Sequence, residues 1–109
     1  MIYVFANDDR GLSVHATERE AVAACEGIDV EDGNYLFFSS DGRPLQPKLI
    51  RPNRRGASLV TSGKYVLEPL GQTASPGLRE VLSRVTYVEG CGMNSIDMVK
   101  AQLTEAEHD

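Results

Sequence analysis

Few side chains in this sequence could carry out covalent chemistry, and they lie far apart. The candidates for a nucleophile and its base are two cysteines and two histidines: Cys25, Cys91, His15 and His108. Cys25 falls on the apolar stripe of an expected helix and should be a buried structural thiol, whereas Cys91 lies between two glycines and should be exposed. His15 shares a strand face with Ser13 and should face solvent or a sheet edge, while His108 lies in a short tail. Since no pattern pairs a nucleophile with a base, we do not expect an enzyme.

Patterns for a metal ion or a phosphate group are also sparse. A zinc site needs three or four convergent ligands, and the two cysteines and two histidines form no close pair. The glycines around Cys91 lack the preceding parallel strand and the lysine of a phosphate-binding loop. Residues 29–33 lack the alternating ligands and the final glutamate of an EF-hand. We therefore expect no metal and no cofactor.

The charges fall into three blocks along the chain. Residues 1–32 carry 8 acidic and 2 basic side chains, residues 33–64 carry 1 and 6, and residues 65–109 carry 7 and 3. The net charge of −5 is unlike that of a general nucleic-acid-binding domain, which is usually basic. A basic middle third thus lies between two acidic flanks.

Four carboxylates are crowded into seven residues after the first expected helix: Glu26, Asp29, Glu31 and Asp32. They cannot all find partners within so short a segment. They therefore form either a solvated loop that keeps the protein soluble or a negative surface that attracts a basic partner.

The opposite cluster places five cations near three prolines: Arg43, Lys48, Arg51, Arg54 and Arg55. Residues 39–64 contain no aromatic side chain on which bases could stack, so nucleic acid is not the expected ligand. A protein contact or an intramolecular pairing with the acidic segment fits better. We take the four carboxylates, together with Arg54 and Arg55, as candidate partner-binding residues.

Short strand patterns fill most of the first two thirds of the chain. Residues 2–5 and 12–16 predict an N-terminal hairpin, and residues 35–38 and 43–50 predict a second one around Asp41 and Gly42. Three prolines in or near the last segment predict an edge strand or an irregular extended segment. Residues 58–61 and 64–67 flank Ser62 and Gly63 and predict a third hairpin.

Three helices are expected around these strands. Thr17 and Glu20 form a capping box, so the first helix begins at about Glu18 and ends where Gly27 adopts a left-handed conformation, before an acidic loop. The second begins at residues 75–76, and its apolar positions recur at helical spacing: Leu78, Val81, Leu82, Val85 and Val88. The last is capped by Asn94 or Ser95, turns Ile96, Val99 and Leu103 inward, and frays into the acidic tail at 105–109.

This order of elements predicts one α+β domain over residues 1–109, with a mainly antiparallel sheet of about six short strands. The apolar start of the chain is broken by residue 7, and no run reaches the roughly 18 apolar residues of a membrane span. We expect a soluble cytoplasmic protein without a signal peptide or a membrane anchor, and with free thiols.

Four stretches carry a weak resemblance to known proteins: residues 24–33, 37–45, 52–56 and 62–67. They look similar to small orphan proteins of Gram-negative bacteria, which often resemble the immunity proteins that neutralise secreted toxins. The resemblance covers about residues 1–70 and implies no catalytic residue. It suggests an immunity-type inhibitor that meets a toxin through its acidic segment. A homodimeric interaction or regulatory module is the alternative, and a small enzyme or ligand binder comes third.

Overall fold

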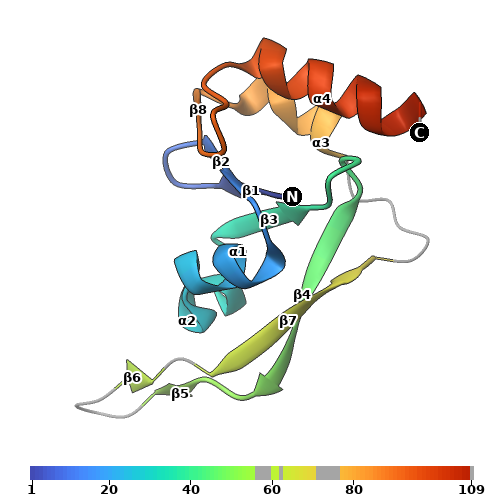
Figure 1. Ribbon diagram of the computed structural model, residues 1–109. Coiled ribbons are helices and arrows are strands. Elements are labelled where there is room, and N and C mark those ends of the chain that lie inside the picture. Colours follow the sequence, from blue (N-terminus) through green and yellow to red (C-terminus); the bar gives the residue numbers. More distant parts are fainter. Residues whose placement is uncertain (56–59, 62, 71–76, 109) are drawn as a thin grey trace.

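The computed structural model describes residues 1–55, 60–61, 63–70 and 77–108, with only the backbone described at 54–55, 60–61 and 107–108 (Figure 1). Its elements, in chain order, are β1 (Ile2–Ala6), β2 (Gly11–His15), α1 (Glu18–Ala24), α2 (Gly27–Glu31), β3 (Tyr35–Phe38), β4 (Pro44–Arg51), β5 (Arg54–Arg55), β6 (Val60–Thr61), β7 (Lys64–Pro69), α3 (Leu78–Val81), the 3-10 turn η1 (Leu82–Arg84), β8 (Tyr87–Glu89) and α4 (Ile96–His108).

Six strands form one sheet in the order β7-β4-β3-β1-β2-β8. Every neighbouring pair is antiparallel except β2 and β8, which run parallel. The predicted α+β class and the predicted number of strands are therefore confirmed. Helices α3 and α4 cover one face of the sheet, and α1 with α2 lies on the other (Figure 1).

The larger core lies between the sheet and the C-terminal helices. The strand register places Tyr3 opposite both Val14 and Phe38, so their side chains share one face. Val99 and Leu103, one helical turn apart on α4, pack against this face without any exposed area. This burial confirms the predicted inward stripe of the last helix, and the Ser95 hydroxyl accepts a hydrogen bond from the Met98 amide at 3.3 Å as an N-cap does. The backbone of α4 is helical through His108, and the expected fraying of the tail from 105 stays a prediction.

A smaller core lies under α1 and α2. It joins Val4 and Phe37 from the central strands to Ala21, Cys25 and Tyr65. The predicted start of α1 is confirmed, because the Thr17 hydroxyl accepts a hydrogen bond from the Glu20 amide at 3.1 Å.

The predicted end of α1 and the acidic loop after it are wrong. Helix α1 ends at Ala24, and a second short helix, α2, begins at Gly27, which has no positive φ. A side chain at residue 27 would place its Cβ 2.7 Å from Asn53 Oδ1, so close packing explains this glycine.

Strands β4 and β7 form a long ribbon that projects from the sheet (Figure 1). Strand β3 pairs with β4 only at Pro44 and Leu45, and from Gln46 onward the described partner of β4 is β7. The prediction that the proline-rich segment is an edge strand is therefore wrong at its start, where β4 lies between two strands. The edge strand on this side of the sheet is β7, and β8 is the edge strand on the other side.

The predicted third hairpin is also wrong. Strand β7 pairs with β4, while β6 pairs with β5, so Gly63 joins two successive pieces of one arm. Residues 56–59 and 62, which include parts of the predicted turns, lie outside the described residues. The second hairpin is confirmed, with Phe37 opposite Leu45 across the turn at Asp41 and Gly42.

The predicted helix over residues 76–88 is wrong in its second half. Helix α3 ends at Val81, η1 ends at Arg84, and Val88 lies in strand β8 beside Leu12 of β2. The five apolar residues of the predicted stripe are nevertheless all buried. Their expected capping residues, Ser75 and Pro76, lie outside the described residues.

Candidate functional site

The four clustered carboxylates lie on or beside the short helix α2. Glu26 precedes its first turn, Asp32 follows its last, and both are exposed, as is Glu31. Asp29 is half-buried. The predicted surface charge is therefore placed on a helical turn rather than on a loop.

The fold adds a tyrosine and a fifth carboxylate that the sequence reasoning missed. Burial raises the pKa of Tyr35 first, and the negative charges of Cys25, Asp29, Asp8 and Glu26 raise it further. Asp8 comes from the turn between β1 and β2, about twenty residues before α2 in the sequence. We call this set the acidic surface: Asp8, Glu26, Asp29, Glu31, Asp32 and Tyr35.

Two hydrogen bonds from Asn7 hold the turn of the first hairpin beside the end of α2. Its amide nitrogen donates to Asn34 O at 2.9 Å, and its side-chain Nδ2 donates to Gly33 O at 2.8 Å. Gly33 has a positive φ of 78°, which suits a glycine at this reversal of the chain. The acidic surface is thus built from two backbone segments that are fixed to each other.

Asn53 connects α2 to the β4–β7 ribbon. Its Nδ2 donates to Gly27 O at 3.0 Å and to Glu31 Oε2 at 2.7 Å, and its Oδ1 accepts from the Gly63 amide at 2.7 Å. Glu31 therefore has a structural partner, while its charge still faces outward on an exposed side chain.

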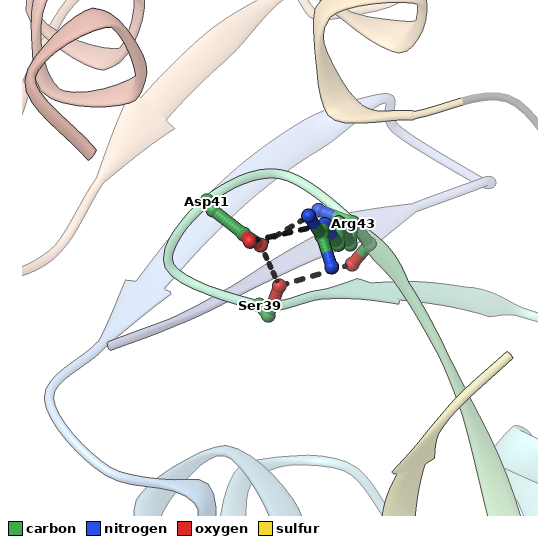
Figure 2. A network of polar contacts seen from close by, with 3 residues as sticks. All are labelled: Ser39, Asp41 and Arg43. Carbon is green, nitrogen blue, oxygen red and sulfur yellow. Dashed lines mark hydrogen bonds and ion pairs between the residues drawn. The ribbon is translucent and has the colours of Figure 1, made fainter. Parts of the chain in front are cut away.

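The predicted basic cluster is spread along the ribbon and does not form one patch. Figure 2 shows Arg43 at the turn that begins the ribbon, where its Nε lies 3.2 Å from Asp41 Oδ2 and Ser39 also donates to Asp41. The Ser39 hydroxyl is the main cause of the lowered pKa of Asp41. Arg54 and Arg55 lie in β5 at the far end, after up to about 35 Å of extended chain. Only their backbone is described, so their predicted role in binding stays a prediction.

The two cysteines differ in exposure, as the sequence predicts. Cys25 is 4% exposed, and its burial, followed by the nearby charge of Asp29, raises the pKa of its thiol to about 11. The thiol is therefore protonated and unreactive near neutral pH. Cys91 is exposed and has a positive φ of 51° between Gly90 and Gly92.

His15 is half-buried on β2, beside Ser13, and its Nε2 lies 2.9 Å from Ser13 Oγ. Burial lowers its pKa, and the charges of Glu20 and Glu89 oppose that shift. Strand β8 pairs with β2 only from Gly11 to Ser13, so His15 has a strand partner on one side, Ile2 of β1, as a position at a sheet edge does. Within the described part of the chain His15 has no hydrogen bond to a carboxylate, which a serine–histidine catalytic triad would need.

Comparisons with protein-family models, curated proteins and solved structures find no match. In residues 1–55, 60–61, 63–70 and 77–108, no group of three or more potential metal ligands converges, and no helix has the length and apolar character to cross a membrane.

Proposed function

We propose that this chain is a non-catalytic protein-binding protein that covers a basic surface of its partner, as an immunity-type inhibitor of a bacterial toxin would. The observation that carries the proposal is the acidic surface, where carboxylates from two separate segments, Asp8 on one and Glu26 and Asp29 on the other, act on Tyr35 and raise its pKa after burial does. Several like charges held together on fixed backbone attract a cationic partner over a distance and speed its association.

Tyr35 gives this surface an anchor as well as a charge. Tyrosine is enriched among the residues that dominate binding energy, and its ring can accept an arginine or lysine over its face. The ring is half-buried and packs beside Phe37, with 6.3 Å between the ring centroids. A basic side chain of the partner would find both a fixed aromatic face and nearby carboxylates.

The first test pairs the chain with the product of the gene beside its own. Co-expression of this chain should restore growth to cells that make a toxic neighbour, and the purified proteins should form a stable complex. A variant with Tyr35→Ala and Glu26→Gln should lose protection while it keeps its cooperative unfolding transition. Full protection by this variant would exclude the acidic surface as the contact.

The ribbon favours a second candidate function, a homodimeric interaction module. Among the described residues, three of the five exposed large apolar side chains lie on β4 and β7: Leu49, Ile50 and Val66. Such side chains on a projecting arm are typical of a protein contact. Glu18 partly blocks the free edge of β7, because its Oε1 accepts the Leu67 amide at 2.9 Å. A dimer would therefore form through side-chain packing rather than by joining two sheets.

Sedimentation of the isolated protein distinguishes the two candidates. A homodimer should dissociate when Val66→Glu places a charge on the exposed ribbon, whereas the acidic-surface variant should leave it unchanged. A monomer at all concentrations tested would contradict the second candidate and would leave the first intact.

A further inference from the structure

A hollow of about 510 Å³ lies where the end of α1 and the start of α2 face the ribbon. Its volume is in the range of small-molecule sites, which is roughly 300–1,000 Å³. The side chains that decide its chemistry come from both walls: Arg19, Val22, Glu26, Ile50, Lys64 and Tyr65.

The interior of the hollow is suited to an apolar body. Ile50 is 62% exposed, the highest value for a large apolar side chain among the described residues, and it lines the hollow opposite Val22. The Tyr65 hydroxyl is already used, because it donates to Cys25 O at 2.7 Å and to Val22 O at 3.4 Å. A bound apolar chain would cover Ile50 without leaving a polar group of Tyr65 unpaired.

The rim of the hollow favours a negative group. Arg19 from α1 and Lys64 from β7 both line it, against one carboxylate from Glu26. Within the described residues, neither cation forms an ion pair or a side-chain hydrogen bond. The ion pair that these residues do form joins Arg43 to Asp41, away from the hollow. Two cations of the lining, one from α1 and one from β7, that have no partner among the described residues complement the charge of a carboxylate.

Both walls are held in place before any ligand binds. Asn53 joins α2 to Gly63, Glu18 joins α1 to β7, and the Tyr65 hydroxyl joins β7 to the end of α1. A side chain at residue 63 would place its Cβ 1.8 Å from Arg51 O, so a glycine is needed where the ribbon bends at this wall. A preformed hollow loses less conformational freedom on binding than a flexible one.

We propose that this hollow binds a small free carboxylic acid with an apolar body, which Arg19 and Lys64 hold by its carboxylate and which covers Ile50. The hollow shares Glu26 with the acidic surface but not Tyr35, and the variants that test the hollow leave every residue of the acidic surface unchanged, so either proposal can fail without the other.

Three probes with the same eight-carbon body separate charge from apolar contact: octanoate, 1-octanol and octylammonium. Titration calorimetry at neutral pH should give the lowest Kd for octanoate and the highest for octylammonium. The double variant Arg19→Gln, Lys64→Gln should raise the Kd of octanoate about tenfold or more and leave that of 1-octanol nearly unchanged. The matched control Lys48→Gln, Lys100→Gln makes the same change in net charge outside the hollow and should bind octanoate as the wild type does.

A filling variant tests the place of binding. Ala23 is exposed and lines the hollow, so Ala23→Trp should occupy the space and abolish binding of octanoate and 1-octanol alike, without loss of the unfolding transition. The proposal is overturned if octanoate binds no better than octylammonium, if the control pair weakens it as much as the rim pair, or if Ala23→Trp binds normally.

Discussion

The buried thiol of Cys25 should make the stability of this fold depend on pH in the alkaline range. Burial raises the pKa of its thiol in the folded chain from an ordinary value of 9.0 to about 11. The unfolded chain therefore loses this proton at a lower pH than the folded chain does. The neutral thiol stabilises the fold fully below about pH 9, and this contribution is lost as the pH rises toward 11.

We expect the free energy of unfolding to fall by about 1–3 kcal/mol between pH 9 and pH 11 because of Cys25. Tyr65 adds to the fall from about pH 10 upward, since burial also raises its pKa from the ordinary value of 10.0. Chemical denaturation across this range should show a smaller fall for Cys25→Ala than for the wild type. Cys91→Ala is the control and should keep the wild-type slope, because its thiol is exposed. Equal slopes for Cys25→Ala and the wild type would contradict the assignment.

Asn53 is the residue whose loss should separate α2 from the ribbon. Its side chain makes three hydrogen bonds, two as donor and one as acceptor. Asn53→Ala should therefore lower the free energy of unfolding by about 1–3 kcal/mol. Asn94→Ala, at an exposed asparagine near α4, should cost less than about 0.5 kcal/mol. Equal effects of the two substitutions in urea unfolding would show that Asn53 does not join the two elements.

At the scale of elements, burial was easier to predict from the sequence than conformation. The stripe from Leu78 to Val88 fits a helix, and all five residues are buried, yet only the first four-residue turn is α-helical. The Thr86 hydroxyl and amide bond to the backbone of the first hairpin, and β8 pairs with β2. These contacts join residues that are remote in sequence, so no local pattern of residues predicts them. The same reason hides Asp8, which comes near Tyr35 and the residues of α2 only in the fold.

A substitution at Leu82 tests whether the apolar stripe is buried. Leu82 lies in the larger core, although helix α3 ends one residue before it. Leu82→Ala should lower the free energy of unfolding by about 2–5 kcal/mol, since it leaves a cavity beneath α3 and α4. Ser83→Ala changes the exposed neighbour and should cost less than about 1 kcal/mol. A loss below about 0.5 kcal/mol for Leu82→Ala in thermal or urea unfolding would show that this residue is not in the core.

The two glycines beside Cys91 allow the cost of backbone strain to be compared with the cost of a steric clash. Both have positive φ, 107° at Gly90 and 75° at Gly92. A Cβ at residue 90 would also lie 2.2 Å from Val14 O, whereas one at residue 92 would have no atom within 4 Å. Gly92→Ala should thus cost about 1 kcal/mol from the backbone alone, and Gly90→Ala clearly more, because it disturbs the junction with β2. Equal losses in urea unfolding would mean that the chain after β8 does not pack against β2 as described.

At the scale of the whole molecule, the elongated shape separates the charges that lie near each other in sequence. The molecule measures 48 × 28 × 24 Å, and the ribbon projects from the sheet beneath α1 and α2 (Figure 1). The sequence indicates an acidic segment followed by a basic one. The fold brings Asp8 near the segment that carries Glu26, Asp29 and Tyr35 and distributes the basic residues along an arm, which the sequence could not show.

The final prediction concerns how this surface meets a basic partner. The triple variant Asp29→Asn, Glu31→Gln, Asp32→Asn keeps the shape of each side chain, and a glutamine at residue 31 still offers an oxygen to Asn53. Glu31 and Asp32 are exposed and Asp29 is half-buried, and charges at such positions contribute little to stability, so the variant should unfold with a free energy within about 1 kcal/mol of the wild type. Its association rate with the partner should be about tenfold lower at low salt, and the difference should shrink as ionic strength rises.

A second triple variant separates local charge from net charge. Glu80→Gln, Asp97→Asn and Glu105→Gln remove the same three charges from the exposed surface of α3 and α4, on the opposite face of the sheet. If the acidic surface is the contact, this variant should associate nearly as fast as the wild type in stopped-flow measurements at every salt concentration. If both variants slow association equally, the attraction depends on the charge of the whole molecule, and the contact has to be sought along the ribbon between Arg43 and Arg55. Local steering by the acidic surface requires that only the first variant associate slowly and that the association rate of the wild type depend more steeply on salt than that of this variant. The reason is that only charges near the contact act within the screening length, which is about 10 Å at 0.1 M salt.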